Sequence, residues 1–250
     1  LKDVMGLSES DTILPITPMF HANAWGIPHA AIMLGAKLVL PGPQPLPIDN
    51  LKLLESEKVT FSCAVPTVWM MLDAIMQREK FDLSSLRMVA CGGSAVPLEM
   101  MRTYQDRYGV KILQLWGMTE TSPLGTVAHV RSDMQHLSSE EQYNIRIKQG
   151  SPAPGIEIRA IQESGEEAPW DGKTMGELQV RGPWVVESYF NDERSAGSFI
   201  DGWFKTSDVV TIDSNGYIQI MDRTKDVIKS GGEWISSVEL ENAIMAHPEV

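Results

Sequence analysis

The chain has 250 residues, with 21 Lys and Arg against 33 Asp and Glu, which gives a formal net charge of −12. Hydrophobic residues make up 43% and charged residues 22%, a composition typical of a globular protein and not of a disordered one. The acidic balance argues against nucleic acid as a partner, since that needs a basic face. Two cysteines, Cys63 and Cys91, are too few for a disulfide framework.

The sequence contains no segment that predicts a transmembrane helix. Ala64–Leu72 is too short to cross a bilayer, and Ile27–Leu40 is interrupted by a histidine and a lysine. A signal-peptide pattern is also missing, so we expect a cytoplasmic protein. The chain starts with Leu1 rather than Met and stops at Val250 after a helical pattern, so we expect a piece of a longer protein.

Residues 12–125 alternate apolar, strand-like runs with helical stretches. We expect strands at Ile13–Thr17, Lys37–Leu40, Phe61–Val65, Arg87–Cys91 and Lys111–Leu115, and helices at Trp25–Leu34, Ile48–Glu57, Thr67–Gln77 and Pro97–Tyr108. This alternation predicts an α/β fold with an open, mainly parallel sheet and flanking helices. Ligands of such sheets bind beyond the carboxyl ends of the strands, which points to the loops after Cys91 and Leu115.

The second half of the chain has a different texture. Residues 126–148 are polar and irregular, and from Gly150 onward short strands dominate. We expect these strands at Ile156–Ile161, Gly176–Arg181, Val209–Asp213 and Tyr217–Met221, the last two joined by a hairpin at Asn215-Gly216. The sequence therefore predicts three regions: an α/β subdomain at 1–125, a connecting loop with a small β-rich, barrel-like subdomain at 126–222, and a further domain that starts at 223.

Gly92-Gly93-Ser94 follows a predicted strand and has three interpretations. A serine nucleophile at such a turn would need glycine two places on either side, but position 96 is Val. Glycines also let the backbone approach a flat ring or a phosphate closely, which favours nucleotide contact. A tight turn without a ligand is the third interpretation.

Four other segments carry side chains that suit a nucleotide. Thr119 and Glu120 could bind a phosphate oxygen and Mg²⁺, although a helix N-cap explains them equally well. Asp208 could accept hydrogen bonds from a ribose diol, or it could cap a turn. Asp222-Arg223 could be no more than an exposed ion pair, and Lys229–Trp234 no more than a hairpin. Singly, these segments predict only a nucleotide-binding α/β protein.

The ordered combination of motifs resembles the adenylate-forming superfamily, and within it acyl-CoA synthetases of the medium- and long-chain fatty-acid type. The likeness covers essentially the whole chain. The motifs that carry it, in chain order, are Pro18–Gly26, Trp116–Thr121, Gly176–Gly182, Trp203–Asp208, Asp222–Glu233 and Ser230–Ser237. The resemblance implies half of the large domain of an adenylate-forming enzyme, then a small barrel-like subdomain and the start of an α+β lid domain.

The resemblance also implies a reaction. A carboxylic acid and ATP give an acyl-adenylate and pyrophosphate, and the thiol of coenzyme A then displaces AMP. By carry-over, Thr119 binds the α-phosphate, Glu120 holds Mg²⁺, His21 lies near the carboxylate of the acid, and Lys229 meets the ligand in the second step. The residues implied to line the adenine and ribose pockets are Gly93, Ser94, Ala95, Gln114, Leu115, Trp116, Gly117, Asp208 and Arg223.

Three further roles follow from the resemblance. Trp25 and Gly26 are expected near the acyl channel, Trp234 is expected to gate it, and Lys225 matches the hinge of the lid. Position 116 holds Trp where the family usually has Tyr, which keeps a flat face for stacking. The family's phosphate loop and its C-terminal catalytic lysine are expected outside residues 1–250, so we expect the isolated chain to be inactive.

Several alternatives stay open at this point. An adenylation domain that loads a carrier protein shares these motifs, as does a luciferase-like oxidase, although Trp234–Ser237 favours coenzyme A as the acceptor. From a different class, the chain could be a nucleotide-binding or scaffolding module without turnover. A homodimer of the full-length form is a further option. The sequence does not reveal the length of the acyl chain.

Overall fold

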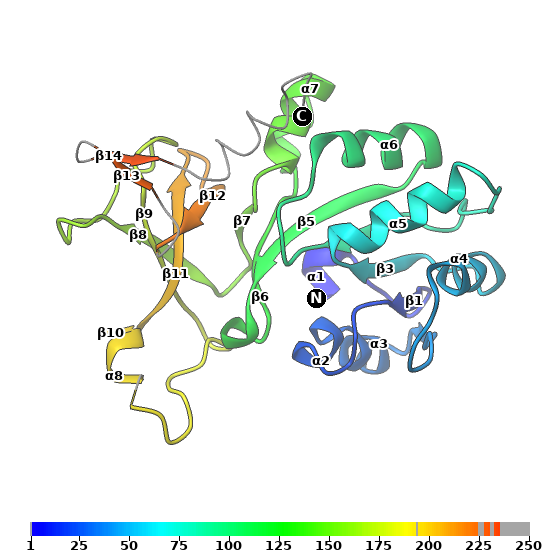
Figure 1. The fold of residues 1–250 in the computed structure, drawn as a ribbon, viewed down its shortest axis with the longest axis horizontal. Helices are drawn as coiled ribbons and strands as arrows, with labels where there is room; N and C mark the ends of the chain where they lie inside the picture. The colour runs from blue at the N-terminus through cyan, green and yellow to red at the C-terminus, as the bar shows by residue number, and fades with distance from the viewer. Residues whose placement is uncertain (1, 194, 225–227, 231–232, 236–250) are drawn as a thin grey trace. The chain divides into compact units, whose positions relative to one another are not determined.

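The computed structural model describes residues 2–193, 195–224, 228–230 and 233–235. The chain divides into two compact units, Leu1–Ile147 and Lys148–Val250. Figure 1 shows helices and strands together in the first unit and mainly strands in the second. Within the described residues, no helix combines the length and the apolar character that crossing a bilayer requires.

A mainly parallel sheet forms the centre of the first unit. Its strands are β1 (Thr12–Pro15), β2 (Lys37–Leu38), β3 (Phe61–Ala64), β4 (Met88–Cys91), β5 (Lys111–Gly117) and β6 (Leu124–Val127). They lie in the order β2-β1-β3-β4-β5-β6, with parallel pairing up to β5 and an antiparallel pair between β5 and β6. The predicted parallel α/β fold is therefore confirmed.

Helices cover both faces of this sheet (Figure 1). They are α1 (Lys2–Met5), α2 (Ala22–Trp25), α3 (Ile27–Leu34), α4 (Pro47–Ser56), α5 (Pro66–Met76), α6 (Leu98–Tyr108) and α7 (Ser139–Arg146), with 3₁₀ turns η1 (Thr119–Thr121) and η2 (Ser132–Met134). On the face covered by α4, α5 and α6, Trp69 and Tyr104 meet edge to face with ring centroids 6.0 Å apart. The hydroxyl of Tyr104 also donates to the carbonyl of Trp69, so the large buried rings leave no polar atom unpaired there.

The start of the first long helical segment differs from the sequence-based prediction. The prediction was one helix over Trp25–Leu34, whereas the right-handed helix α3 begins only at Ile27. Gly26 has φ +69° and ends the preceding turn, so the chain changes its helical sense at this glycine. Trp25 therefore belongs to the short turn α2, which has unusual backbone geometry.

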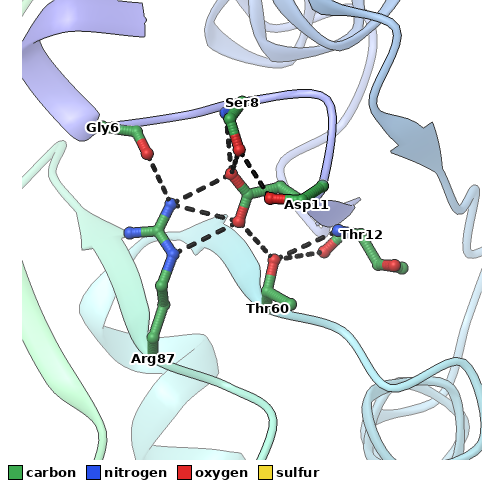
Figure 2. Close-up of polar contacts among 7 residues, drawn as sticks. Gly6, Ser8, Asp11, Thr12, Thr60 and Arg87 are labelled. Carbon is green, nitrogen blue, oxygen red and sulfur yellow. Dashed lines mark hydrogen bonds and ion pairs between the residues drawn. The ribbon is translucent and has the colours of Figure 1, made fainter.

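A buried carboxylate ties the amino ends of three parallel strands together (Figure 2). Asp11, before β1, accepts from the hydroxyl of Thr60 at 2.6 Å and from the backbone N–H of Ser8 at 2.8 Å. Arg87, before β4, reaches the same carboxylate at 3.2 Å and donates to the carbonyl of Gly6. Burial opposes ionisation of Asp11, but the bonds from Thr60, Ser8 and Arg87 outweigh it and lower its pKa.

The second unit is an antiparallel sheet in which β11 is the central strand. The strands of this sheet are β8 (Glu157–Ile161), β9 (Gly176–Arg181), β10 (Phe199–Ile200), β11 (Trp203–Ile212) and β12 (Ile218–Arg223). The unit also contains the short strand β7 (Ser151–Pro152) and the helix α8 (Ser195–Ser198), which lie outside this sheet. Strand β11 pairs with β9, β10 and β12, and β9 also pairs with β8. Asn215 and Gly216 lie in the predicted hairpin between β11 and β12.

Strand β11 is longer than the sequence indicated. The prediction began it at Val209 and placed Asp208 before it, but the strand starts at Trp203 and contains Asp208. Irregular pairing permits this, because Ser207 has φ +64° and the register with β9 shifts between Lys205 and Val209. The predicted domain boundaries after residues 125 and 222 stay predictions.

Beyond residue 224, two short strands form a hairpin. Strand β13 (Ile228–Ser230) pairs antiparallel with β14 (Glu233–Ile235), and Lys229 stands opposite Trp234. Lys225, the predicted hinge, lies outside the described residues, as does most of the predicted lid segment.

Candidate functional site

Two loops lie side by side at the carboxyl end of the parallel sheet. Strands β4 and β5 are neighbours, so the loop that starts at Gly92 and the end of β5 share one edge. A Cβ on Gly92 would lie 2.9 Å from the carbonyl oxygen of Leu115, which leaves no room for a larger residue. Gly93 has φ +85°, a conformation that favours glycine. The loop therefore exposes Gly93, Ser94 and Ala95 at this edge.

Gln114 holds the first of these loops in place. Its side chain is 1% exposed, its carbonyl accepts from the backbone N–H of Val96 at 2.9 Å, and its amide donates to the carbonyl of Ile147 at 3.0 Å. Both ends of the amide are therefore engaged with the chain itself. This geometry fixes the path of residues 93–96 relative to β5, and a direct contact of Gln114 with adenine stays a prediction.

The turn after β5 presents Thr119 and Glu120. Gly117 is required here, because a Cβ at this position would lie 1.8 Å from the carbonyl oxygen of Pro123. The backbone N–H of Met118 donates to that same carbonyl at 3.0 Å and to the hydroxyl of the buried Thr121 at 3.0 Å. The turn is thus closed on its inner side, while Thr119 is exposed and Glu120 is half-buried.

Trp116 is buried against the next strand. The indole covers Gly125, since a Cβ on that glycine would lie 2.3 Å from a ring carbon of Trp116. Trp116 is 7% exposed, and Leu115 is buried in the core on the other side of the strand. The flat face predicted for nucleotide stacking is therefore packed at least in part on the protein itself, and the predicted contacts of Leu115 and Trp116 with adenine remain untested.

A left-handed helical turn lies next to this edge. All four residues of α2 have positive φ, from +43° at Ala22 to +57° at Trp25, and none of them is glycine. A left-handed turn costs roughly 1–2 kcal/mol per residue for side chains other than glycine, so this turn is strained. The backbone N–H of Gly26 partly offsets the cost by donating to the carbonyls of Ala22 and Asn23. Strain of this kind is concentrated at functional sites.

A cavity of about 640 Å³ lies between this turn, α3 and the turn after β5. Its lining is mainly apolar, with a few polar side chains that come from the left-handed turn, from α3 and from the turn after β5. The lining residues are Ala22, Asn23, Gly26, His29, Ala30, Met33, Leu34, Thr119 and Ser122. Apolar walls with a few convergent polar groups are typical of a small-molecule site. The structure therefore brings Gly26, predicted near an acyl channel, together with Thr119, predicted at a phosphate.

Two other predicted residues lie at the border of the cavity rather than in its lining. His21 is exposed and directly precedes the left-handed turn, where its backbone N–H donates to the carbonyl of Pro18. Trp25 is 9% exposed and packs into the core. Trp25 therefore supports the turn from behind, and the roles predicted for both residues stay predictions.

The second unit brings Asp208 and Arg223 together. They are register partners on β11 and β12, and the Nε of Arg223 lies 2.8 Å from a carboxylate oxygen of Asp208. Asp208 is 4% exposed, and its backbone N–H donates to Thr206. The guanidinium of Arg223 is more than half exposed, so a neutralised carboxylate and an accessible cation stand at one place.

Sequence reasoning missed several of the residues that line the cavity. His29 and Ser122, for example, were not predicted. The signal was present, because Gly26, His29, Ala30 and Met33 follow the spacing of one helix face. Nothing in the sequence indicated that this face of α3 would line a cavity while the face that carries Ile27 and Ala31 is buried in the core.

The predicted magnesium ligand was Glu120. The described residues contain no group of three or more His, Cys, Asp or Glu side chains that could hold a metal ion. Mg²⁺ is commonly bound by one or two carboxylates together with phosphate oxygens and water. The half-buried Glu120 beside the exposed Thr119 fits a site in which one carboxylate binds Mg²⁺ together with phosphate oxygens and water.

Comparison with known proteins gives consistent results. A sequence profile of the AMP-binding enzyme family matches residues 1–190. A long-chain-fatty-acid–CoA ligase from Thermus thermophilus is 45% identical over 252 residues, and a medium-chain-fatty-acid–CoA ligase from Ectopseudomonas oleovorans is 46% identical over 250 residues. Each alignment covers 100% of this chain but only 46% of the relative, so the chain spans less than half the length of these relatives.

A solved structure shows the same fold. It is an o-succinylbenzoate–coenzyme A synthetase from Bacillus subtilis in complex with ATP and a magnesium ion. The TM-score is 0.83 at 29% identity, and the match covers 100% of this chain and 49% of that one.

Proposed function

The chain belongs to the AMP-binding enzyme family, and from that premise we propose that it is the central part of an ATP-dependent acid–CoA ligase. The full-length protein would join a carboxylic acid to the α-phosphate of ATP and release pyrophosphate. The thiol of coenzyme A would then attack the acyl-adenylate and release AMP. We propose a fatty acid as the substrate, in keeping with the two ligases that share nearly half of its residues, and the cytoplasm as the location.

The observation that carries this proposal is the edge shared by the two loops. The loop at Gly93–Ala95 offers backbone groups to a nucleotide, and Thr119 offers an exposed hydroxyl from the adjacent turn. Negative charge builds up on the α-phosphate during adenylation, and a fixed donor stabilises that charge. Glu120 would hold Mg²⁺ with the phosphates, and the ion would neutralise them.

The cavity beside Thr119 would hold the acid. Thr119 and Ser122 line it from the turn after β5, while Ala30, Met33 and Leu34 line it from α3 together with His29. A carboxylate bound near Thr119 would therefore be followed by an apolar chain along α3. Burial of the apolar part of the acid would release water and supply binding free energy of roughly 0.8 kcal/mol per buried CH₂.

Exchange of labelled pyrophosphate into ATP tests the adenylation step. In the full-length protein, we expect Thr119→Ala to lower the exchange rate by about 100-fold, the scale for loss of one fixed donor to the transition state. The matched control is Thr103→Ala on α6, which should exchange at the unchanged rate. Equal rates in the two variants would refute the role of Thr119. The isolated chain should exchange far more slowly than the full-length protein.

A panel of straight-chain acids tests the acyl site. We expect Ala30→Phe, which fills the cavity, to shift the preference toward shorter acids without loss of ATP binding. Ile32→Phe is the control, since Ile32 is exposed on the same helix and is not part of the lining. If both variants keep the original chain-length profile, the acid binds elsewhere.

Asp208 and Arg223 are proposed to bind the ribose. Asp208→Asn should weaken ATP binding about tenfold, because a charged acceptor becomes a neutral one. The matched control is Glu157→Gln, which breaks the exposed ion pair with Arg181 on neighbouring strands of the same sheet. Calorimetric titration with ATP separates the two, and unchanged affinity in Asp208→Asn would contradict the ribose contact.

A further inference from the structure

A second cavity lies on the first unit, at the opposite end of β5 from Thr119. It has a volume of about 380 Å³ and is formed by the C-terminal part of α6, the first residue of β5, the η2 turn region and α7. Its lining is mostly polar and consists of Gln105, Asp106, Lys111, Val130, Gln135, Ser139, Gln142, Tyr143 and Arg146. None of these residues belongs to the site described above.

Two cations face this cavity, and neither forms an ion pair within the described part of the chain. Arg146 is 8% exposed, stacks on the ring of Tyr143 at 4.9 Å, and donates from one terminal nitrogen to the carbonyl of Ile112 at 3.3 Å. Its Nε is buried and has no hydrogen-bond partner among the described residues. A buried donor left without a partner is costly, so the guanidinium of Arg146 keeps hydrogen-bonding capacity that the described residues do not use.

Lys111 adds a second charge at the same place. Burial lowers the pKa of Lys111, and the nearby Arg146 lowers it further. Burial also lowers the pKa of Arg146. Asp106 is the one carboxylate in the lining. It is exposed and forms no ion pair of 4 Å or less with either cation, although its charge raises the pKa of Arg146 and so opposes the effect of burial. Two partly dehydrated like charges destabilise each other unless an anion lies between them.

We propose that this cavity is a binding site for a phosphate-type oxyanion. Lys111 and Arg146 supply the charge, and the amide side chain of Gln105 and the hydroxyl of Ser139 supply polar surroundings. The chain as a whole has a formal net charge of −12, so a cavity lined by two cations and one carboxylate is unusual for it. A planar guanidinium and an ammonium together suit the oxygens of a phosphate or of a phosphorylated small molecule. The inference does not depend on the proposed ligase activity.

The test uses the full-length protein and inorganic phosphate as the probe. At matched ionic strength, we expect millimolar phosphate to raise the thermal midpoint by about 2–4 °C relative to chloride. Lys111→Met should weaken phosphate binding about tenfold in calorimetry, because it removes one charged donor. The same variant should be at least as stable as the original protein without phosphate, since it removes a poorly solvated charge.

Two further variants keep the test decisive if one of them folds poorly. Gln105→Glu places a carboxylate in the cavity and should also abolish the response to phosphate. Lys37→Met is the matched control, because Lys37 is likewise the first residue of a parallel strand but is exposed and paired with Glu57 at 2.7 Å. It should keep the full response.

Competition with AMP separates this cavity from the candidate nucleotide site. The proposal requires phosphate binding to persist when AMP is saturating. A response that AMP abolishes and that Lys111→Met leaves unchanged would overturn the proposal, and so would no response to phosphate at all. Pyrophosphate as a second probe would show whether the site takes one phosphate or a longer chain.

Discussion

The two ends of the parallel sheet treat polar groups in opposite ways. At the amino ends, the carboxylate of Asp11 accepts from both Thr60 and Arg87 and so ties three strands together (Figure 2). At the carboxyl ends, glycines bring the backbone close and leave Thr119 exposed beside a cavity. One end therefore uses its polar side chains for stability, while the other keeps them available for a ligand.

Gly117→Ala is expected to have the largest effect at the carboxyl end of the parallel sheet. Its Cβ would overlap the carbonyl of Pro123 at 1.8 Å, and that carbonyl closes the turn that presents Thr119. We expect about 3 kcal/mol of lost stability, with loss of pyrophosphate exchange. Urea denaturation measures the first effect. The control is Gly197→Ala, which has open space around the new methyl group; similar losses in both variants would contradict the argument.

The amino end is tested by Asp11→Ala. We expect about 2 kcal/mol of lost stability, because the variant leaves Arg87 and Thr60 without their shared acceptor. Pyrophosphate exchange at a temperature where both proteins are folded should hardly change. Lost stability with unchanged exchange would distinguish Asp11→Ala from Gly117→Ala, which should lose both. A large loss of exchange in a folded Asp11→Ala protein would show that the two ends of the sheet do not differ in this way.

The same carboxylate predicts a pH dependence. The pKa of Asp11 is lower in the folded protein than in the unfolded chain, so its stabilising effect is complete above the ordinary value of about 4. The effect is lost as the pH falls through the folded pKa. Thermal midpoints measured between pH 7 and pH 2 should therefore fall less steeply in Asp11→Asn than in the original protein. Parallel curves would show that other carboxylates dominate acid unfolding.

The smallest expected effect comes from a matched pair of alanines in the cavity lining. Ala22 lies in the left-handed turn and Ala30 in the right-handed helix α3, and both are half-buried. Glycine relieves strain at the first position and adds chain entropy at the second. We expect Ala22→Gly to raise stability by roughly 1 kcal/mol and Ala30→Gly to lower it by roughly 0.5–1 kcal/mol. Changes of the same sign would show that the turn is not strained.

The sequence predicted the alternation of strands and helices in the first unit because each strand is an apolar run bounded by turn residues. It could not predict the left-handed turn, since Ala22–Trp25 contains no glycine and reads as ordinary helix. Strand β11 was predicted too short, because the charge on Asp208 disguises a buried strand position. Its partner Arg223 lies 15 residues away, and only the register of the sheet shows that the two meet.

The candidate site was predictable in part. Motif order predicted Thr119, Gly93 and Asp208 as site residues, and their contacts with a nucleotide stay predictions. The open face of α3 was not predictable, since periodicity shows which residues share a face but not whether that face is covered. The pair Lys111 and Arg146 was missed for a related reason. Lys111 begins β5 and Arg146 ends α7, and only folding brings the two elements together.

The single amide of Gln114 connects β5, the loop at Val96 and the carbonyl of Ile147. A glutamate there could still accept from Val96 but would have no N–H to give to Ile147. A substitution at position 114 would therefore also shift the loop at residues 93–96 and the segment that ends at Ile147. Substitutions meant to change the predicted adenine pocket should therefore begin at Ser94 and Ala95, because both residues are exposed and a new side chain there can extend into solvent.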